Sequence, residues 1–360
     1  VLGLDRLCRQ KALENFSRIF KDEPRLMLWL NFEPGVLDQL KHQTGKLLEQ
    51  VKAAGIDPGR IVIEILESKV SNTKALREFI YNYRELGFLI AIDDWGTAYS
   101  NMARIDQIKP DVIKVHRSLV DHLESAFYKQ ELIRSILNLA RGIGALVVVE
   151  GVETEEAALS AMDLGASIIQ GFYFCKPGDS WEIMQSRCEE RSRLLSAAYK
   201  TRKIKMVNER RAYFKKIDAI AGDVKQALRD LPLSEYDRIL ERLIELHPEL
   251  ECLYILNENG IQLTKTVCSG RCLRQDSFLF HSPRKGTNRS LGDFFLLIQS
   301  GLARYVSEPY ISKTTGNRCV TISRVFEAPG GRRLVFCADC DCHRETLRVA
   351  HSRQRISSVG

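Results

Sequence analysis

The sequence lacks any long hydrophobic run. No stretch of its 360 residues approaches the roughly 18–20 consecutive apolar residues that a membrane-spanning helix needs. It also lacks an initiator methionine, since it begins at Val1, and it shows no signal-peptide pattern. These absences predict a cytoplasmic protein without a membrane partner, and we expect part of the N-terminus to be missing from the sequence.

The sequence has little excess charge of either sign. Lys and Arg outnumber Asp and Glu by 53 to 46, which gives a net charge of +7. Much of the excess lies in residues 187–216, where "YKTRKIKMVNERRAYFKK" alternates basic and apolar residues with helical spacing. A solvated helix face explains this pattern better than a nucleic-acid site does, so we expect no nucleic-acid partner.

Cysteine is scarce in the first half of the sequence and concentrated near its end. Three of the ten cysteines precede residue 190, and seven lie between Cys252 and Cys342. In a reducing compartment they are better explained as thiols or metal ligands than as disulfides. The segments "CSGRC" and "CADCDCH" supply a candidate cluster for Zn²⁺ or another metal: Cys268, Cys272, Cys337, Cys340, Cys342 and His343. A redox site and plain buried thiols remain alternatives.

Short apolar runs alternate with helix-like stretches between residues 26 and 180. The runs predict parallel strands buried on both faces, and stretches such as 71–87, with apolar residues at three-to-four spacing and a closing glycine, predict helices. Six such units favour a (β/α)8 TIM-type barrel over an open sheet. Because residues 1–16 are predicted to be helical, the first strands of the barrel would precede Val1.

The pattern changes after the barrel-like region. Residues 181–231 predict a helical connector with a short break near "AIAGDV". Two hairpins follow, one around Asn259-Gly260 and one around Pro329-Gly330-Gly331, with a helix-like stretch between them. We therefore predict three parts: a barrel in 1–180, the connector in 181–231, and an α+β domain with an antiparallel sheet in 232–350.

Each apolar run of the barrel-like region ends near a polar residue. In chain order these residues are Asn31, Glu64, Asp93, Asp94, Lys114, Glu150 and Gln170. The carboxyl ends of barrel strands converge on one mouth, so these side chains would face one another. Carboxylate and amide oxygens are the ligands that Mg²⁺ and Mn²⁺ prefer, and two adjacent aspartates can bridge a metal pair that acts on a phosphodiester. The alternative, that barrel mouths are simply polar, explains six strand ends in sequence less well.

Several segments resemble one known family. "DDWGTAYSNM", "EGVETEE", "QGFYFCKP" and "IEILES" are similar, in order and spacing, to the signature segments of EAL-domain cyclic di-GMP phosphodiesterases, over about residues 1–180. The resemblance implies hydrolysis of cyclic di-GMP to linear pGpG with one or two Mg²⁺ or Mn²⁺ ions. The metal ligands that it implies are Asn31, Glu64, Asp93, Asp94 and Glu150.

The resemblance also implies roles for residues around the metal. Lys114 would stand beside the attacking water, with Glu150 as the second catalytic residue, and Gln170 would lie at the last strand. Glu67 and Glu153 would hold the loop after the aspartate pair, and Trp95 belongs to that loop.

The sequence departs from the family at four points. The glutamate of the EAL signature and a substrate-contacting arginine shortly after it would lie upstream of Val1. The family's K-x-D becomes Lys114-Val115-His116, and the loop carries Trp95 for phenylalanine and Ala98 for glycine. Two alternatives to an enzyme therefore stay open: a catalytically degenerate cyclic di-GMP receptor, and a sensory protein whose barrel is vestigial.

The order of the parts narrows the resemblance. An EAL domain, a long helix and a C-terminal PAS-like or Cache-like domain resemble a subgroup known from Gram-positive bacteria, with "LYILNENGIQLT" carrying the second match. This implies a sensory or dimerising module with an unspecified small ligand. We expect a homodimer, formed through the connecting helix.

Overall fold

The structure is a computed structural model, and it describes residues 2–32, 44–66, 73–97, 102–178, 180–228, 230–270 and 280–341. The chain divides into two compact units, Val1–Thr201 and Arg202–Gly360. No helix among the described residues is both long and apolar enough to cross a membrane.

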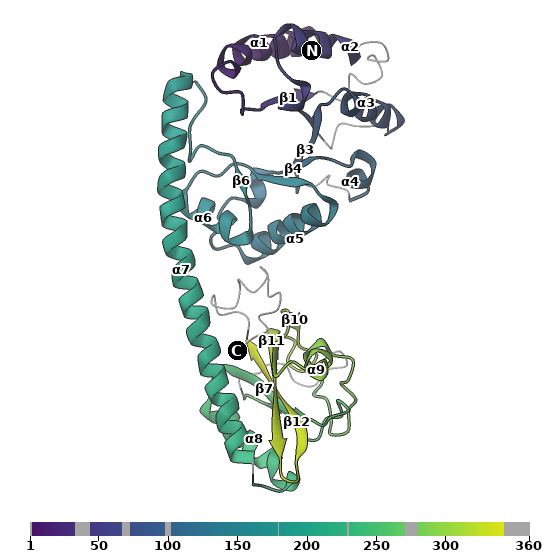
Figure 1. The fold of residues 1–360 in the computed structure, drawn as a ribbon, viewed down its shortest axis with the longest axis vertical. Helices are drawn as coiled ribbons and strands as arrows, with labels where there is room; N and C mark the ends of the chain where they lie inside the picture. The colour runs from purple at the N-terminus through teal and green to yellow at the C-terminus, as the bar shows by residue number, and fades with distance from the viewer. Residues whose placement is uncertain are drawn as a thin grey trace. The chain divides into compact units, whose positions relative to one another are not determined.

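The first unit is built on a parallel sheet of six strands whose spatial order follows the chain. The strands are β1 (Leu28–Phe32), β2 (Ile61–Leu66), β3 (Leu89–Trp95), β4 (Val112–Val115), β5 (Leu146–Val149) and β6 (Ile168–Ile169). The helices that alternate with them (Figure 1) are α1 (Leu2–Phe20), α2 (Thr44–Ala53), α3 (Thr73–Glu85), α4 (Met102–Ile108), α5 (Phe127–Ile143) and α6 (Glu155–Leu164). This arrangement confirms the prediction of a parallel, barrel-type α/β domain.

The helix ends of the first unit follow from local sequence. Thr154 precedes α6, and its hydroxyl accepts a hydrogen bond from the amide of Ala157 at 3.1 Å. Glu155 and Glu156 then occupy the first turn, where carboxylates favour the helix dipole. The helix ends at Gly165, whose φ of +104° suits glycine. These caps fix the position of α6 directly after the loop that follows β5.

One long helix, α7 (Trp181–Leu228), contributes to the cores of both units. Leu195 is buried in the core of the first unit, whereas Ile220 and Val224 are buried in that of the second. The predicted break near "AIAGDV" is wrong, because Gly222 lies inside an unbroken helix. Packing of Ile220 and Val224 on either side of Gly222 outweighs the cost of a helical glycine, about 1 kcal/mol relative to alanine.

The second unit holds an antiparallel sheet in the order β10-β11-β12-β7-β8, with β9 also pairing with β11. Its elements are α8 (Tyr236–Leu246), β7 (Leu250–Leu256), β8 (Val267–Cys268), α9 (Asp293–Gln299), β9 (Arg304–Val306), β10 (Tyr310–Ile311), β11 (Arg318–Ala328) and β12 (Arg332–Asp341). Helices α7 and α8 pack on one face of the sheet and α9 on the other. The predicted α+β class with an antiparallel sheet is confirmed. The arm after Asn259-Gly260 is more irregular than predicted, since its ladder with β7 consists of an isolated bridge at Gln262 and the two residues of β8.

The predicted cysteine cluster does not assemble around β12. Cys337 packs with Phe295 on the α9 face of the sheet, whereas Cys340 packs with Leu250 on the opposite face. The two thiols therefore lie on opposite faces of the sheet, so the prediction that Cys337 and Cys340 chelate one metal ion is wrong. Three other members of the cluster lie outside the described residues: Cys272, Cys342 and His343.

Candidate functional site

Two layers of side chains lie on the inner face of the parallel sheet. The lower layer is apolar and includes Trp29, Val62, Ala91, Val112, Val148 and Ile168. The residues two positions further along the same strands are Asn31, Glu64, Asp93, Lys114, Glu150 and Gln170. Side chains two apart on a strand share a face. The polar residues therefore form a second layer at the carboxyl end of the sheet.

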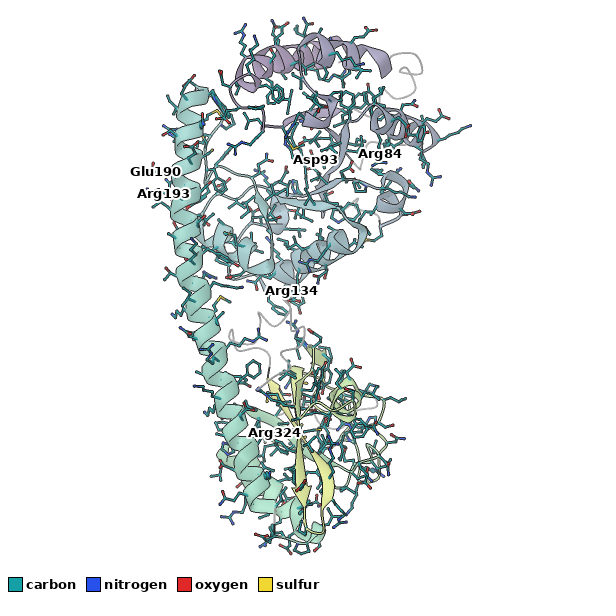
Figure 2. The ribbon with its side chains drawn as sticks, in the orientation of Figure 1. Arg84, Asp93, Arg134, Glu190, Arg193 and Arg324 are labelled. Atoms are coloured by element: carbon teal, nitrogen blue, oxygen red, sulfur yellow. The ribbon has the colours of Figure 1, made fainter. Side chains whose placement is uncertain are left out.

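Lys114 lies at the centre of this polar layer. Its Nζ is 2.7 Å from Oε1 of Glu64, 3.2 Å from Oδ1 of Asp93 and 2.6 Å from Oε1 of Glu150. Glu64 and Lys114 are each 5% exposed and Asp93 is 8% exposed, so these charges interact at low dielectric. Figure 2 marks Asp93 among the strands of the first unit. Asn31 of β1 pairs with Glu64 of β2, and the side chain of Asn31 is exposed.

Carboxylate groups outnumber the single ammonium group in this layer. Burial raises the pKa of Glu64 and of Glu150, and the ion pairs with Lys114 oppose this only in part. Burial also works against a charged Lys114, but its ion pairs with Glu150 and Glu64 outweigh burial and raise its pKa. Lys114 is therefore an ammonium at neutral pH, and an additional cation would be favoured beside it.

A β-bulge makes two adjacent aspartates available at the mouth. Ile92 pairs with Ile113 and Trp95 pairs with Val115, so the register between β3 and β4 gains one residue at Asp93-Asp94. Asp94 has a φ of +59°, and the amide of Asp94 donates to Oδ1 of Asp93 at 2.9 Å. In a regular strand adjacent side chains point to opposite faces. The bulge removes that constraint, and strained backbone of this kind is common next to functional sites.

The same bulge corrects the prediction for Trp95. In a regular strand Trp95 would share a face with Asp93, two residues earlier. The extra residue instead turns Trp95 toward the helices, where it is 3% exposed and packs in the main core with Val115 and Leu123. Trp95 therefore does not line the mouth, and it is the last residue of β3 rather than part of the loop to which the sequence assigned it.

His116 follows β4 and lies beside the aspartate pair. Its backbone amide donates to the carbonyl of Trp95 at 2.9 Å, which extends the β3–β4 pairing by one residue. Its Nε2 lies 3.9 Å from Oδ1 of Asp94. Its Nδ1 accepts a hydrogen bond from the amide of Ser118 at 3.2 Å and so caps a short helical turn. The side chain is thus fixed at the edge of the polar layer and brings no negative charge to it.

The ends of β5 and β6 are joined by a close backbone contact. The amide of Gln170 donates to the carbonyl of Val149, and the amide of Val152 donates to the carbonyl of Gln170. A Cβ on Gly171 would overlap the carbonyl oxygen of Val152, so only glycine fits there. This contact positions Glu150 and Gln170 side by side at the mouth.

Of four further residues that the sequence singles out, the structure describes two. Gln170 is exposed at the mouth, and Glu153 is exposed in the loop between β5 and α6. Glu67 and the segment 98–101, which includes Ala98, lie outside the described residues. The predicted role of Glu67 and Glu153 in holding that loop therefore stays a prediction.

The sequence did not lead us to expect Trp29 at the site. The Nζ of Lys114 lies 5.8 Å from the centroid of the Trp29 ring, which is within the range of a cation–π contact. Trp29 precedes Asn31 by two residues in "LMLWLN". Strand alternation alone could have placed it beneath the polar layer.

The polar layer fits a divalent cation. Ligand atoms of Asp93, Asp94 and Glu150 all lie within 4.8 Å of one another. Opposite ligands around an ion with metal–oxygen distances of 2.0–2.6 Å are about 4–5 Å apart, so these three carboxylates can share one ion. Oε1 of Glu150 is buried, and it forms an ion pair with the ammonium of Lys114 at 2.6 Å.

The comparisons with known proteins agree with this geometry. The family model of the EAL domain matches residues 2–177. Residues 2–177 are an EAL domain. The EAL-domain containing protein YkuI of Bacillus subtilis is 27% identical over 289 residues, which cover 78% of this chain and 68% of YkuI. PdeF of Escherichia coli, named a cyclic di-GMP phosphodiesterase, is 34% identical over 123 residues.

The matches differ in how much of each relative they cover. The PdeF match covers 34% of this chain and only 16% of PdeF, and an Azorhizobium caulinodans protein with 34% identity is covered over 19% of its length. A crystal structure of YkuI with its EAL domain, in complex with the substrate c-di-GMP and calcium, superposes with a TM-score of 0.71 and 24% identity. It covers 94% of this chain and 84% of YkuI, which supports the same fold along the EAL domain and beyond it.

Proposed function

We propose that the EAL domain is a metal-dependent phosphodiesterase that hydrolyses one phosphodiester bond of cyclic di-GMP to give linear pGpG. The observation that carries the proposal is the buried layer in which Glu64, Asp93 and Glu150 surround Lys114 at 2.6–3.2 Å. The name of PdeF and the ligand in the YkuI crystal structure support cyclic di-GMP as the substrate.

The proposed metal is one or two ions of Mg²⁺ or Mn²⁺. Asp93, Asp94 and Glu150 would hold it, with Glu64 and the amide oxygen of Asn31 as the neighbouring oxygen ligands. When bound, a divalent cation would supply Lewis-acid activation of the attacking water and neutralisation of phosphate charge.

The side chains of the chain itself would orient and neutralise the reacting groups. Lys114, held as an ammonium by its carboxylate neighbours, would donate a hydrogen bond to the oxygen that attacks phosphorus and would place positive charge beside the phosphoryl oxygens. Glu150 would accept a proton from the attacking water, since burial raises its pKa and makes it a stronger base than a solvated carboxylate. The P–O3′ bond breaks and the O3′ atom takes up a proton, which leaves a 3′-hydroxyl and a 5′-phosphate on linear pGpG.

Chromatography of the nucleotides tests this proposal. The protein is incubated with cyclic di-GMP and Mn²⁺ or Mg²⁺, alongside Glu64→Gln and the matched control Glu78→Gln, which alters an exposed glutamate on α3. We expect pGpG from the unmodified protein and from Glu78→Gln but not from Glu64→Gln. Equal activity of all three proteins would refute a role for the polar layer.

His116 favours a second candidate function. It stands beside Asp94 where the family has an aspartate, so this edge of the layer has one negative charge fewer. A domain that binds cyclic di-GMP without cleaving it would serve as a receptor. Intact nucleotide retained by the protein in equilibrium dialysis, in the same reactions, would establish this alternative and exclude the enzyme.

For the rest of the chain we propose a PAS-like or Cache-like sensory module in 232–350, joined through the connector 181–231 to the barrel of 1–180. A homodimer through α7 in the cytoplasm is also part of the proposal. Ile183, Leu194, Ile204 and Val207 of α7 are 44–62% exposed, and such apolar side chains favour a protein partner. Light scattering should give a dimer mass that Ile204→Glu lowers.

A further inference from the structure

Cys252 on β7 and Cys268 on β8 stand directly opposite each other in the second sheet. The flanking amide of Ser269 donates to the carbonyl of Glu251 at 2.8 Å. This hydrogen bond places the cysteine pair at a non-hydrogen-bonded site of the antiparallel ladder, where opposite Cα atoms are about 4.5 Å apart. A disulfide requires a Cα separation of about 4.4–6.8 Å, so the backbone already has the geometry of a bridge.

The two sulfurs lie closer than unbonded neighbours prefer. Their Sγ atoms are 2.7 Å apart. Non-bonded heavy atoms favour separations of roughly 3.5–4.0 Å, and a disulfide bond is about 2.05 Å long. Both side chains are therefore already in rotamers that point the sulfurs at each other, and bond formation needs no change of strand register.

The two thiols differ in their access to solvent. Cys252 is fully buried, whereas Cys268 is partly exposed on β8, the edge strand of the sheet. A small oxidant therefore reaches Cys268 first, and Cys252 is protected behind it. By contrast, burial raises the pKa of Cys337 to about 12, so that cysteine stays an unreactive protonated thiol.

We propose that Cys252 and Cys268 form a dithiol site that a hydroperoxide oxidises to a reversible intrachain disulfide. The Cys268 thiol gives up its proton and its sulfur attacks one oxygen of hydrogen peroxide. The O–O bond breaks, Cys268 becomes a sulfenic acid, and the departing hydroxide takes up the proton and leaves as water. The sulfur of Cys252 then attacks the Cys268 sulfur, the S–O bond breaks, and a second water leaves. Two thiols have lost two electrons and two protons, and the peroxide has become two waters.

The bridge would act on the segment that it encloses. Residues 252–268 include the Asn259-Gly260 turn and Gln262, which accepts a hydrogen bond from Arg289 at 3.3 Å. β8 is an edge strand that pairs with β7 over only two residues. The disulfide would fix this edge and limit opening of the enclosed turn.

Peptide mapping tests the site on the full chain. Reduced protein is treated with hydrogen peroxide, its remaining thiols are alkylated, and tryptic peptides are analysed by mass spectrometry. Trypsin cuts after Lys265 and after Arg271, so Cys252, Cys268 and Cys272 fall on separate peptides. We expect a Cys252–Cys268 cross-linked peptide and the loss of two of the ten thiols. A dithiol reductant should restore both.

Variants separate this site from general oxidation. Cys268→Ser should abolish the cross-link and the paired thiol loss, whereas the matched control Cys8→Ser, at an exposed position on α1, should keep both. Cys268→Ser alters the partly exposed member of the pair, so it tests the proposal even if Cys252→Ser fails to fold. Full alkylation of Cys252 and Cys268 after peroxide treatment, or a Cys268–Cys272 link in place of the predicted one, would overturn the proposal.

Discussion

The Nε2 atom of His116 lies 3.9 Å from Oδ1 of Asp94, at an edge of the polar layer. His116 is held there by two backbone contacts, to the carbonyl of Trp95 and the amide of Ser118. A side chain at this position is therefore close enough to act on whatever Asp94 binds. Its charge sets how strongly this edge attracts a cation.

The first prediction concerns that charge. His116→Asp should tighten Mn²⁺ binding by roughly 10-fold and raise the rate of cyclic di-GMP hydrolysis, because it adds a carboxylate beside Asp94. His116→Asn is the matched control, since both replacements can cap the turn at Ser118 but only aspartate adds charge. Calorimetric titration with Mn²⁺ measures the affinities. Equal affinities for the two variants would show that Asp94 does not share its ligand with this position.

The second prediction concerns Lys114. Removing its ammonium leaves Glu64, Asp93 and Glu150 buried together, and an uncompensated buried charge costs about 3–5 kcal/mol. Lys114→Met should therefore lower the free energy of unfolding of metal-free protein by that amount. Excess Mn²⁺ should restore part of the loss, because a bound cation replaces the missing charge.

Tryptophan fluorescence during urea unfolding measures this effect. All three tryptophans of the chain lie in the first unit, and Trp29 faces Lys114. Lys52→Met, at an exposed position on α2, is the control and should change stability by less than about 0.5 kcal/mol. If Lys114→Met and Lys52→Met had the same free energy of unfolding without metal, the carboxyl groups of Glu64, Asp93 and Glu150 would have to be largely protonated.

Alternation of apolar and polar residues was enough to predict the strands of the first unit and their polar ends. Runs such as "IVIEIL" are buried on both faces, and one face carries both Val62 and Glu64. Helices with a capping threonine and a closing glycine, such as α6, were equally predictable. In these elements local propensity and tertiary packing favour the same conformation.

Features that depend on register were not predictable. The bulge at Asp93-Asp94 adds one residue to β3 and so reverses the face of the sheet on which Trp95 lies. The sequence "IDDWG" contains no signal that predicts this bulge. Cys337 and Cys340 resembled a zinc pair by spacing, yet strand β12 separates them onto opposite faces. The close approach of Cys252 and Cys268 depends on the register of β7 with β8. That register could not be predicted from the sequence, because the turn between the two strands is irregular.

The third prediction concerns the pH dependence of the second unit. Burial raises the pKa of Asp339 from 3.8 to about 6, although Arg289 and a hydrogen bond from Thr321 oppose the shift. Between these two values Asp339 binds more protons in the folded chain than in the unfolded chain. Its contribution to stability is therefore fully present below about pH 4 and is lost as pH rises through 6. A shift of this size corresponds to about 3 kcal/mol at most.

Scanning calorimetry of the second-unit transition from pH 4 to pH 7 measures this dependence. Asp339→Asn keeps an oxygen that can accept the hydrogen bond from Thr321 but cannot ionise. The variant should lose the fall in melting temperature across this range. A fall that persists unchanged in Asp339→Asn would assign the pH dependence to another group, such as Glu251.

The last prediction concerns the backbone contact that joins β5 to β6. Gly171→Ala places a methyl group against the carbonyl of Val152, so the segment that carries Glu150 must shift. Displacement of a catalytic group by about 1 Å can cost 100-fold in rate, and overpacking costs about 1–3 kcal/mol in stability. Gly142→Ala in α5, where a methyl group would meet no atom within 4 Å, should instead stabilise the domain by about 0.5–1 kcal/mol. Phosphodiesterase assays and thermal unfolding of both variants therefore separate a local effect at the mouth from a general intolerance of alanine. Full activity in Gly171→Ala would mean that the position of Glu150 does not depend on this contact.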